Sequence, residues 1–426
     1  MGNNIFIFGI GGIGISALAR MFLLEGKKVT GSDLAESLVT KELEKAGVKV
    51  IIGQDISYVP KDTDLIIYTV ALTELAPELF AELGKLNTPV YSYPEMLGII
   101  SKEKYTIAIA GTHGKTTTTA MVGKVLIDAK FDPTIIVGSL LKDFNSNFVA
   151  GNSKYLVVEA DEYRRSFINL NPSILVITNI DEDHLDYYKD IEDIKKAFIQ
   201  LVRKIPKEGV LICNSHAPNM ADIVKNARCN IADFSLLDVS VKLLVPGEHN
   251  IKNAKAALAV GKILNIGLSE ILSSLKTFSG TWRRFELKGK TPAGALVYDD
   301  YAHNPQKVRA ALLGAKEAYP DKKIIAVFQP HLYSRTKFLL KEFAESFNDV
   351  HEVIVLPIYA AREKLDSSIS SEILCEEIKK YNKNVQYVSD MNTAYDLVLK
   401  NDSPDYLVIT MGAGDITELS DKLIKK

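Results

Sequence analysis

Residues 105–119 read YTIAIAGTHGKTTTT, and this stretch decides the fold class of the chain around it. An apolar run, Thr106–Ala110, leads into a glycine loop that ends in Gly-Lys-Thr. In a phosphate-binding loop of this type, backbone N–H groups hold the phosphates, Lys115 reaches the β- and γ-oxygens and Thr116 binds Mg²⁺. The standard spacing would place glycine where Ile109 stands, so the loop is a shortened variant. Four consecutive threonines are poor helix formers and favour a functional role. We predict ATP binding here.

A second glycine-rich turn lies near the N-terminus. The apolar run Ile5–Phe8 leads into Gly9-Ile10-Gly11-Gly12-Ile13-Gly14, and we expect a helix from about Ser16. This G-x-G-x-x-G pattern permits a tight turn, and the helix N-terminus offers free N–H groups to a pyrophosphate. The next strand candidate ends at Ser32 and Asp33, and Asp33 is placed to bind a sugar hydroxyl. The motif predicts a diphosphate-linked nucleotide without separating NAD from others, and a turn needed only for packing is the alternative.

Apolar strand candidates alternate with amphipathic helical stretches along the whole chain. The strand candidates are rich in Val and Ile with little alternation, which is typical of strands buried on both faces: Asn4–Phe8, Asp64–Tyr68, Thr106–Ala110, Tyr155–Glu159, Ile174–Thr178, Leu296–Tyr298, Ile324–Phe328, Glu352–Leu356 and Tyr406–Thr410. Helical patterns cover Ser37–Ala46, Lys307–Ala318 and Lys337–Phe347. This order predicts an α/β fold with parallel sheets and right-handed crossovers.

Two restarts of the strand–loop–helix pattern suggest domain boundaries. One lies at residues 104–115, and the other lies near Gly280–Phe285, after which we expect a new strand series to begin beyond Pro292. We therefore predict three domains, which comprise residues 1–104, 105–284 and 285–426.

Composition limits the possible partners and compartments. The chain has 426 residues, 51 Lys and Arg, 53 Asp and Glu and a formal net charge of −2, so nucleic acid and anionic membrane are not expected as partners. The three cysteines have no metal-binding spacing and cannot all pair, which favours a reducing compartment. The apolar N-terminal stretch is interrupted by glycines and precedes Arg20, unlike a signal peptide. We expect a cytoplasmic protein without membrane insertion, and the composition does not decide between a monomer and a homodimer.

Acidic residues and a histidine follow two of the strand candidates. Glu159 ends the run Tyr155–Glu159, and His184 follows Ile174–Thr178 in the segment Asn-Ile-Asp-Glu-Asp-His. A carboxylate at a strand end beside a phosphate loop can hold Mg²⁺. Glu159 and His184 are therefore candidate metal ligands, whereas a solvated turn is an equal alternative for the remaining acids, Asp161, Glu162 and Asp183.

Together these segments resemble the Mur ligases, the ATP-dependent amide-forming enzymes of peptidoglycan precursor synthesis. The resemblance rests on Gly-Thr-His-Gly-Lys-Thr-Thr-Thr from Gly111, Glu-Ala-Asp-Glu from Glu159 and Thr-Asn-Ile-x-x-Asp-His from Thr178. Four other segments are similar to the branch that attaches L-alanine to UDP-N-acetylmuramate: Gly-Ile-Gly-Gly-Ile-Gly-Ile-Ser, Phe328-Gln329-Pro330-His331 with Tyr333-Ser334-Arg335-Thr336, Leu356-Pro357-Ile358-Tyr359-Ala360-Ala361, and Met411-Gly412-Ala413-Gly414-Asp415-Ile416. The motifs run in family order from residue 9 to residue 416.

The resemblance implies a fold and a set of site residues. The fold is a Rossmann-like UDP-binding domain, a central P-loop ATPase domain with a mostly parallel sheet, and a C-terminal Rossmann-like α/β domain. The implied catalytic residues are Lys115, Glu159, His184 and Arg284, and the metal ligands are Thr116, Glu159 and His184. ATP would contact Gly111, Thr112, His113, Gly114, Lys115, Thr116, Thr117, Asn250, Asn253, Arg284 and Asp300. The UDP-sugar would contact Gly9, Gly11, Gly12, Gly14, Ser32 and Asp33, and the amino acid Tyr301, His303 and Arg335.

The implied reaction is an ATP-dependent ligation. The lactyl carboxylate of UDP-N-acetylmuramate attacks the γ-phosphate of ATP, an acyl phosphate forms with Mg²⁺ as the metal, and the amine of L-alanine displaces phosphate. From the residues alone, helix capping would explain Asn250 and Asn253, and a surface ion pair would explain Arg284. Trp282 is expected to be a packing residue.

Three departures from the family pattern leave the added group open. Asn304 stands where a second histidine is usual, Leu332 stands where an arginine is usual, and residues 162–167 read EYRRSF. The Glu-Tyr start of that last segment resembles the relative that attaches a whole tripeptide, and Arg164 or Arg165 could replace the missing arginine. An NAD-dependent dehydrogenase and a non-catalytic ATP-binding relative are the alternatives outside this reaction.

Overall fold

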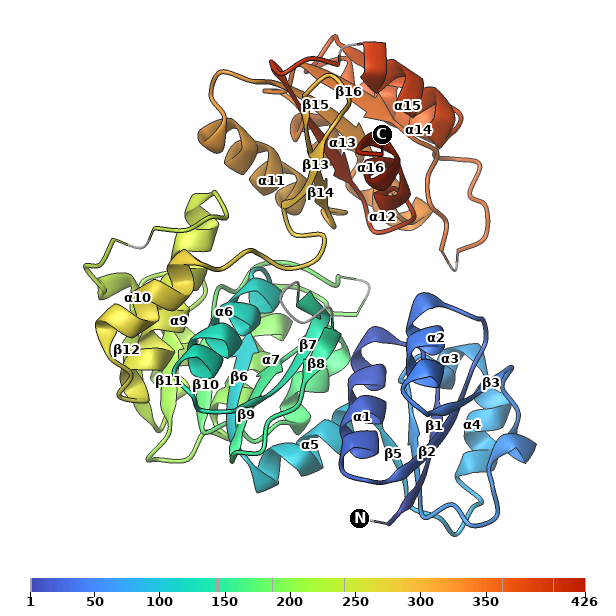
Figure 1. Ribbon diagram of the computed structural model, residues 1–426, viewed down its shortest axis with the longest axis vertical. Coiled ribbons are helices and arrows are strands. Elements are labelled where there is room, and N and C mark those ends of the chain that lie inside the picture. Colours follow the sequence, from blue (N-terminus) through green and yellow to red (C-terminus); the bar gives the residue numbers. More distant parts are fainter. Residues whose placement is uncertain are drawn as a thin grey trace. The chain divides into compact units, whose positions relative to one another are not determined.

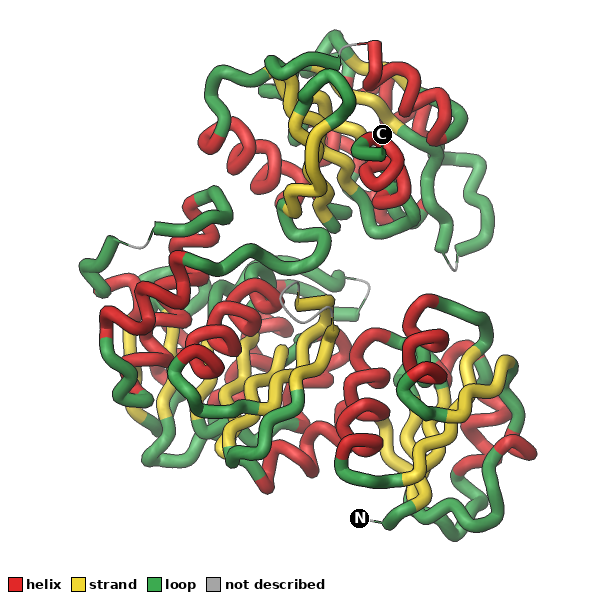
Figure 2. The backbone as a smooth tube through the Cα atoms, in the orientation of Figure 1, coloured by secondary structure: helices red, strands yellow, loops and turns green. Residues whose placement is uncertain are grey.

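The computed structural model describes residues 2–141, 146–185, 187–240, 242–361, 363–400 and 402–425. The chain forms two compact units, of which the first comprises residues 1–242 and 252–278 and the second residues 243–251 and 279–426. Figures 1 and 2 show three separate sheets with helices packed on them, two sheets in the first unit and one in the second. The predicted α/β class with parallel-rich sheets is confirmed.

The N-terminal sheet is wholly parallel, with the order β3-β2-β1-β4-β5. Because the strand order reverses between β1 and β4, the carboxyl end of β1 lies at the position where open α/β sheets bind ligands. The first glycine loop follows β1 at that position. The strands are β1 (Asn4–Phe8), β2 (Lys28–Asp33), β3 (Lys49–Ile52), β4 (Leu65–Tyr68) and β5 (Val90–Ser92), and the helices are α1 (Ile13–Leu24), α2 (Leu38–Lys45), α3 (Leu72–Leu75), α4 (Pro77–Leu83) and α5 (Tyr93–Glu103), with the 3₁₀ turn η1 (Ile56–Tyr58).

The central sheet has the order β12-β11-β10-β6-β9-β7-β8 and is parallel except for the β7–β8 hairpin. Its middle strand β6 lies between β10 and β9, so the second glycine loop, Glu159 and the segment after β10 meet at one edge. The strands are β6 (Tyr105–Ala110), β7 (Thr134–Leu141), β8 (Ser146–Val149), β9 (Tyr155–Glu159), β10 (Ile174–Ile177), β11 (Val210–Cys213) and β12 (Asn230–Asp233). The helices are α6 (Lys115–Asp128), α7 (Ile191–Val202), α8 (Ala221–Asn226), α9 (Glu248–Ile263) and α10 (Leu268–Lys276), with the 3₁₀ turns η2 (Tyr163–Asn169) and η3 (Phe234–Leu236).

The third sheet has the order β13-β14-β18-β15-β16-β17, and β13 is its antiparallel edge strand. The strands are β13 (Glu286–Lys290), β14 (Leu296–Asp300), β15 (Lys323–Phe328), β16 (Glu352–Val355), β17 (Val385–Tyr387) and β18 (Tyr406–Met411). The helices are α11 (Pro305–Ala318), α12 (Tyr333–Phe338), α13 (Leu340–Glu345), α14 (Ser371–Ile378), α15 (Met391–Lys400) and α16 (Thr417–Leu423).

Three local expectations were wrong. The first helix starts at Ile13, ahead of the expected Ser16, because the glycine loop itself forms the turn into the helix. The third strand series starts at Glu286, ahead of Pro292, because β13 pairs back onto β14 as a hairpin. The helix expected over Lys337–Phe347 is divided into α12 and α13 at Leu339, whose φ of −108° and ψ of 27° leave the helical region.

The core of the first unit runs through both of its sheets. One apolar cluster joins β1 and α1 to α5, and continues through β6, β9 and β10 to α7. A second contact is polar: the buried amide of Asn147 on β8 donates to the Ile13 carbonyl and, at 3.0 Å, to Ser16 Oγ in the first turns of α1. The β7–β8 hairpin therefore packs against the helix that follows the first glycine loop.

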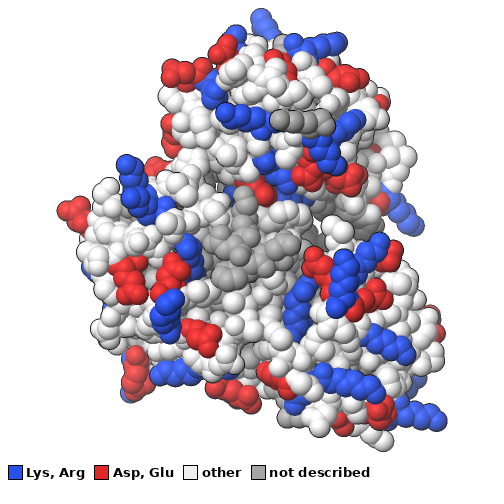
Figure 3. All heavy atoms as spheres, viewed as in Figure 1, with Lys and Arg blue, Asp and Glu red and all other residues white. Residues whose placement is uncertain are grey.

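On the face drawn in Figure 3, basic and acidic side chains are interspersed. This agrees with the formal net charge of −2. Among the described residues, no helix combines the length and apolar character needed to cross a membrane.

Candidate active site

The second glycine loop is held in place by the segment that follows β10. Gly111 and Gly114 have φ values of +129° and +81°, which side chains rarely adopt. Thr178 Oγ1 donates to the His113 carbonyl at 2.6 Å, and the Asn179 side chain both donates to that carbonyl and accepts from the His113 N–H, each at 2.9 Å. The loop is thus held by side chains of the segment that follows β10.

Lys115, the first residue of α6, points back into the loop. Its ammonium group donates to the Gly111 carbonyl at 2.7 Å and to both carboxylate oxygens of Glu162, at 2.6 and 2.9 Å. The two side chains are only 12% and 3% exposed, so the pair is buried. Burial raises the pKa of Glu162 to about 7, and the Lys115 charge opposes this shift. Burial alone would lower the pKa of Lys115, but the carboxylates of Glu162 and its acidic neighbours outweigh it and raise this pKa.

Thr116 and Glu159 form the next layer of the site. The Thr116 hydroxyl donates to Glu159 Oε1 at 2.9 Å, and the other carboxylate oxygen accepts the Gly138 N–H of β7 at 2.7 Å. A hydroxyl beside a carboxylate at a phosphate loop is an oxygen donor set of the kind that Mg²⁺ prefers. Thr116 and Glu159 therefore fit the metal role expected of them. Thr112 is buried and exchanges hydrogen bonds with the backbone of Asp181, whereas Thr117 is half-buried on α6.

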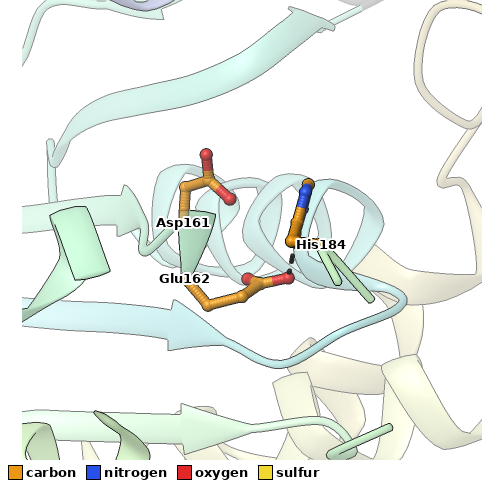
Figure 4. A group of neighbouring side chains, drawn as sticks. All are labelled: Asp161, Glu162 and His184. Atoms are coloured by element: carbon orange, nitrogen blue, oxygen red, sulfur yellow. Dashed lines mark ion pairs between the residues drawn. The ribbon is translucent and has the colours of Figure 1, made fainter. Parts of the chain in front are cut away.

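His184 lies beside a different carboxylate from the one expected. Its Nε2 is 3.9 Å from Glu162 Oε1, and ligand atoms of Asp161, Glu162 and His184 all lie within 4.8 Å of one another (Figure 4). The ring lies 4.7 Å from that of Tyr163, and the backbone at His184 has a φ of +55°. Carboxylate and imidazole ligands suit Mn²⁺ and other divalent ions as well as Mg²⁺, so this group also fits a divalent cation.

The predicted adenine-binding residues, Asn250 and Asn253, both lie on α9 but fall in different units. The Asn253 side chain lies against the glycine loop, because a Cβ added to Gly114 would be 2.4 Å from Asn253 Oδ1. Asn250 belongs to the second unit, and its amide donates to the Pro246 carbonyl at 2.6 Å.

The first glycine loop is closed by its own acidic residue. Asp33 Oδ2, at the end of β2, accepts the Gly11 N–H at 2.8 Å, and Gly9 donates to the Ser32 carbonyl at 2.8 Å. Ser32 Oγ is buried and has no hydrogen-bond partner among the described residues. Asp33 thus supports the loop itself, which was not foreseen. Gly12 is the residue before α1, so N–H groups of the first helical turn follow it.

In the second unit, Arg283 rather than Arg284 is the buried arginine. Its guanidinium bonds Asp299 at 2.8 Å and the carbonyls of Gly414 and Gly412 at 3.0 and 2.6 Å. Arg284 lies with its guanidinium carbon 5.4 Å from the centre of the Tyr301 ring.

Asp300, the predicted ribose ligand, is held by the backbone beside Arg284. It accepts the Phe285 N–H at 2.7 Å. Burial raises its pKa to about 6, although the charge of Arg284 opposes the shift.

The three residues expected to handle the amino acid lie in one aromatic cluster. The His303 ring is 5.1 Å from that of Tyr301 and 6.0 Å from that of His331, and Arg335 Nη1 is 3.3 Å from His331 Nδ1. Burial lowers the pKa of His303 well below its usual value, and Lys307 and Arg335 add to this effect. His303 is therefore neutral at pH 7.

The three departures from the family pattern have structural counterparts. The Asn304 side chain caps α11 by accepting the Lys307 N–H at 2.9 Å, and Leu332 has a φ of +71° at the start of α12. Arg164 pairs with Glu74 and Arg165 with Asp193, so both arginines already have acidic partners within the first unit.

Sequence models of the Mur ligase family match three stretches of the chain. The catalytic-domain model covers residues 4–105, the middle-domain model residues 109–240 and the glutamate-ligase-domain model residues 283–414. The chain belongs to the Mur ligase family. The expectation drawn from the motifs is thereby confirmed.

Relatives of this Mur ligase match it over nearly its whole length. It is 42% identical to the UDP-N-acetylmuramate–L-alanine ligase of Clostridium kluyveri, covering 98% of this chain and 97% of the relative. It is 39% identical to the ligase of the same name from Acetivibrio thermocellus, covering 99% and 96%.

Two solved structures are similar to the ligase as a whole. The UDP-N-acetylmuramate-alanine ligase of Thermotoga maritima matches with a TM-score of 0.82 and 27% identity over 99% of this chain and 98% of that chain. A murein peptide ligase from Psychrobacter arcticus matches with a TM-score of 0.71 and 23% identity over the same shares, which shows the fold alone.

Sequence reasoning missed two features of this Mur ligase site. Glu162 was given no more weight than a solvated acid, yet it is the buried partner of Lys115. Its position in the acidic segment Glu159-Ala160-Asp161-Glu162, directly after β9, was the available signal. Thr178 and Asn179 were read only as part of a motif, and the structure shows that they hold the glycine loop.

Proposed function

We propose that this Mur ligase joins L-alanine to the lactyl carboxylate of UDP-N-acetylmuramate, at the expense of ATP and with release of ADP and phosphate. The observation that carries the proposal is the prepared phosphate loop, in which Lys115 and the Thr116–Glu159 pair lie at one edge of the central sheet. The names of relatives about 40% identical over the full chain support the choice of substrates.

Each unit contributes one part of the reaction. In the first unit, the loop Gly9–Gly14 receives the diphosphate of the sugar nucleotide, and Lys115 leaves Glu162 to contact the phosphates of ATP. In the second unit, Arg284 offsets charge on the transferred phosphoryl group, and Asp300 binds the ribose. Tyr301, His303 and Arg335 orient the amino acid, whose carboxylate suits a guanidinium partner.

The chemistry is a phosphoryl transfer followed by amide formation. The lactyl carboxylate attacks the γ-phosphorus and ADP leaves, which gives an acyl phosphate. The uncharged amine of L-alanine then attacks the acyl carbon, loses a proton and expels phosphate. Positioning and electrostatic stabilisation by Lys115 and Arg284 supply most of the rate enhancement in such transfers. Thr116 and Glu159 would hold Mg²⁺, and His184 beside Glu162 would hold a second divalent cation; such ions neutralise charge on the phosphate oxygens when they are bound.

We infer that the enzyme acts in the cytoplasm. All three cysteines are free thiols, which agrees with a reducing compartment.

Phosphate release tests the proposal. Purified enzyme with ATP, Mg²⁺ and UDP-N-acetylmuramate should release phosphate when L-alanine is added and not when it is omitted. Other single amino acids and the tripeptide L-Ala-γ-D-Glu-meso-diaminopimelate are compared at equal concentration. A preference for the tripeptide would favour the recycling reaction suggested by Tyr163. No turnover with any acceptor would refute the ligase proposal and favour the non-catalytic relative.

A further inference from the structure

Tyr93 is held firmly at the start of α5. Ser92 precedes it as the helix N-cap, and a reciprocal pair of hydrogen bonds joins Ser92 to Glu95: the Ser92 N–H donates to the Glu95 carboxylate at 2.7 Å, and the Glu95 N–H donates back to Ser92 Oγ at 3.4 Å. Further along, α5 packs on the central part of the unit, because a Cβ added to Gly98 would be 2.6 Å from the Asn169 carbonyl oxygen. The ring of Tyr93 therefore starts from a fixed backbone.

The hydroxyl end of Tyr93 lies over the first glycine loop. A Cβ added to Gly14 would be 3.0 Å from Cε1, Cζ and Oη of Tyr93, a distance tighter than ordinary side-chain contacts. Gly14 lies in the first turn of α1, where backbone N–H groups have no partner within the helix. The last glycine of the G-x-G-x-x-G pattern thus makes room for a phenol at the helix N-terminus.

Carboxylates of the central sheet also influence the Tyr93 phenol. Burial raises the pKa of Tyr93, and the charges of Glu159 and Asp161 raise it further. Glu159 is the residue that bonds Thr116 beside the second glycine loop. The phenol therefore stays protonated beside the first glycine loop. Among the described residues, the Tyr93 hydroxyl makes no hydrogen bond.

We propose that the Tyr93 hydroxyl binds the sugar nucleotide, by donating a hydrogen bond to one of its anionic oxygens near the first turn of α1. This inference rests on the proposed function. A phenol suits this position, because it can donate a hydrogen bond to an anionic oxygen without carrying a charge of its own. The anionic oxygen belongs either to the diphosphate or to the lactyl carboxylate, since both kinds of group lie on the same ligand.

Calorimetric binding to Tyr93→Phe tests the inference. The change removes one oxygen atom and keeps the ring, so the packing against Gly14 is retained. Losing a hydrogen bond to a charged group should weaken UDP-N-acetylmuramate binding about tenfold or more. Binding of ATP should stay within twofold of the wild type. The matched control is Tyr105→Phe, at the opposite end of β6, which should bind both ligands as the wild type does.

A second ligand separates the two possible acceptors. UDP-N-acetylglucosamine carries the diphosphate but lacks the lactyl carboxylate. If Tyr93→Phe weakens both ligands, the acceptor is on the diphosphate, and if it weakens only UDP-N-acetylmuramate, the acceptor is the carboxylate. Unchanged binding of UDP-N-acetylmuramate by Tyr93→Phe would overturn this inference and leave the proposed function intact. Failure of the wild type to bind UDP-N-acetylmuramate would overturn both.

Discussion

Replacing Glu162 with glutamine should make the enzyme bind ATP more tightly when no divalent cation is present. Glu162 holds Lys115 through two hydrogen bonds, of 2.6 and 2.9 Å. In the proposed function the same ammonium group contacts the phosphates of ATP, so binding must first break this pair. The carboxylate also repels the triphosphate, because it lies at the loop where the phosphates bind.

The size of the effect follows from the geometry of the pair. At 2.6 Å and an effective dielectric constant of about 20, the Coulomb attraction is roughly 6 kcal/mol, most of which offsets the cost of burying both charges. A charged hydrogen bond retains about 1.5–3 kcal/mol net, and a neutral acceptor about 0.5–1.5 kcal/mol. Glutamine keeps an acceptor oxygen for Lys115, but its hydrogen bond is weaker than that of the carboxylate by about 1–1.5 kcal/mol. Breaking the pair costs ATP that much less. ATP should therefore bind about tenfold more tightly.

The assay is titration of a fluorescent ATP analogue in EDTA, and the matched control is Glu192→Gln. Glu192 is an exposed glutamate of the same unit that pairs with Lys195, so the charge change is the same without contact with the loop. With Mg²⁺ present the gain in ATP affinity should be smaller. In the wild type a cation beside His184 already compensates the Glu162 charge, so removing that charge in the variant changes less. An ATP affinity that is unchanged or weaker in Glu162→Gln, with normal UDP-N-acetylmuramate binding, would refute this account of Lys115.

Four further outcomes follow from the two units. Lys115→Met should lower kcat by at least about a thousandfold in the phosphate-release assay while calorimetric binding of UDP-N-acetylmuramate persists, and comparable turnover would remove Lys115 from the site. Arg283→Ala should lower the urea-unfolding free energy by about 3–5 kcal/mol, because it leaves the fully buried Asp299 charge unpaired. The pKa of His303 in the folded state lies below its unfolded value of 6.5, so its contribution to stability is present above pH 6.5 and is lost as the pH falls. The difference in unfolding free energy between wild type and His303→Gln should therefore narrow from pH 7.5 to pH 5. Parallel curves of unfolding free energy against pH would contradict this pKa assignment. Small-angle scattering should show compaction with an ATP analogue plus UDP-N-acetylmuramate, since the proposed function assigns ATP ligands to both units, and no compaction would count against that assignment.

The parts of the fold that depend on local sequence could be predicted. Each strand followed by a glycine loop was recognised, because glycine at positive φ and a lysine at the helix start leave a clear pattern at Gly111–Lys115. All nine predicted strands are present, and β1 has the predicted bounds. Their Val and Ile content reflects burial on both faces, which single sequences record well.

Features set by tertiary contacts could not be predicted in the same way. Glu162 looks like any acid after a strand, and only the fold brings it to Lys115. The edge strand β13 contains Gly289 and three charged residues, so it lacks the apolar signature of the buried strands. His184, which lies near Glu162, has a left-handed backbone conformation, and the residue types around it do not predict this conformation. The hairpin strand β7 did carry a signal, an Ile/Val-rich run from Thr134, that was not used.

The contact between the β7–β8 hairpin and α1 bears on how such enzymes can be recombined. Asn147 bonds the first turns of α1, and Gly138 on the preceding strand bonds Glu159. One hairpin thus touches both the helix that follows the first glycine loop and a carboxylate beside the second glycine loop. A chimera cut between β5 and β6 would transplant the N-terminal sheet without the strand that fits its helix. To exchange sugar-nucleotide specificity between relatives, the hairpin should therefore be transferred together with residues 1–104.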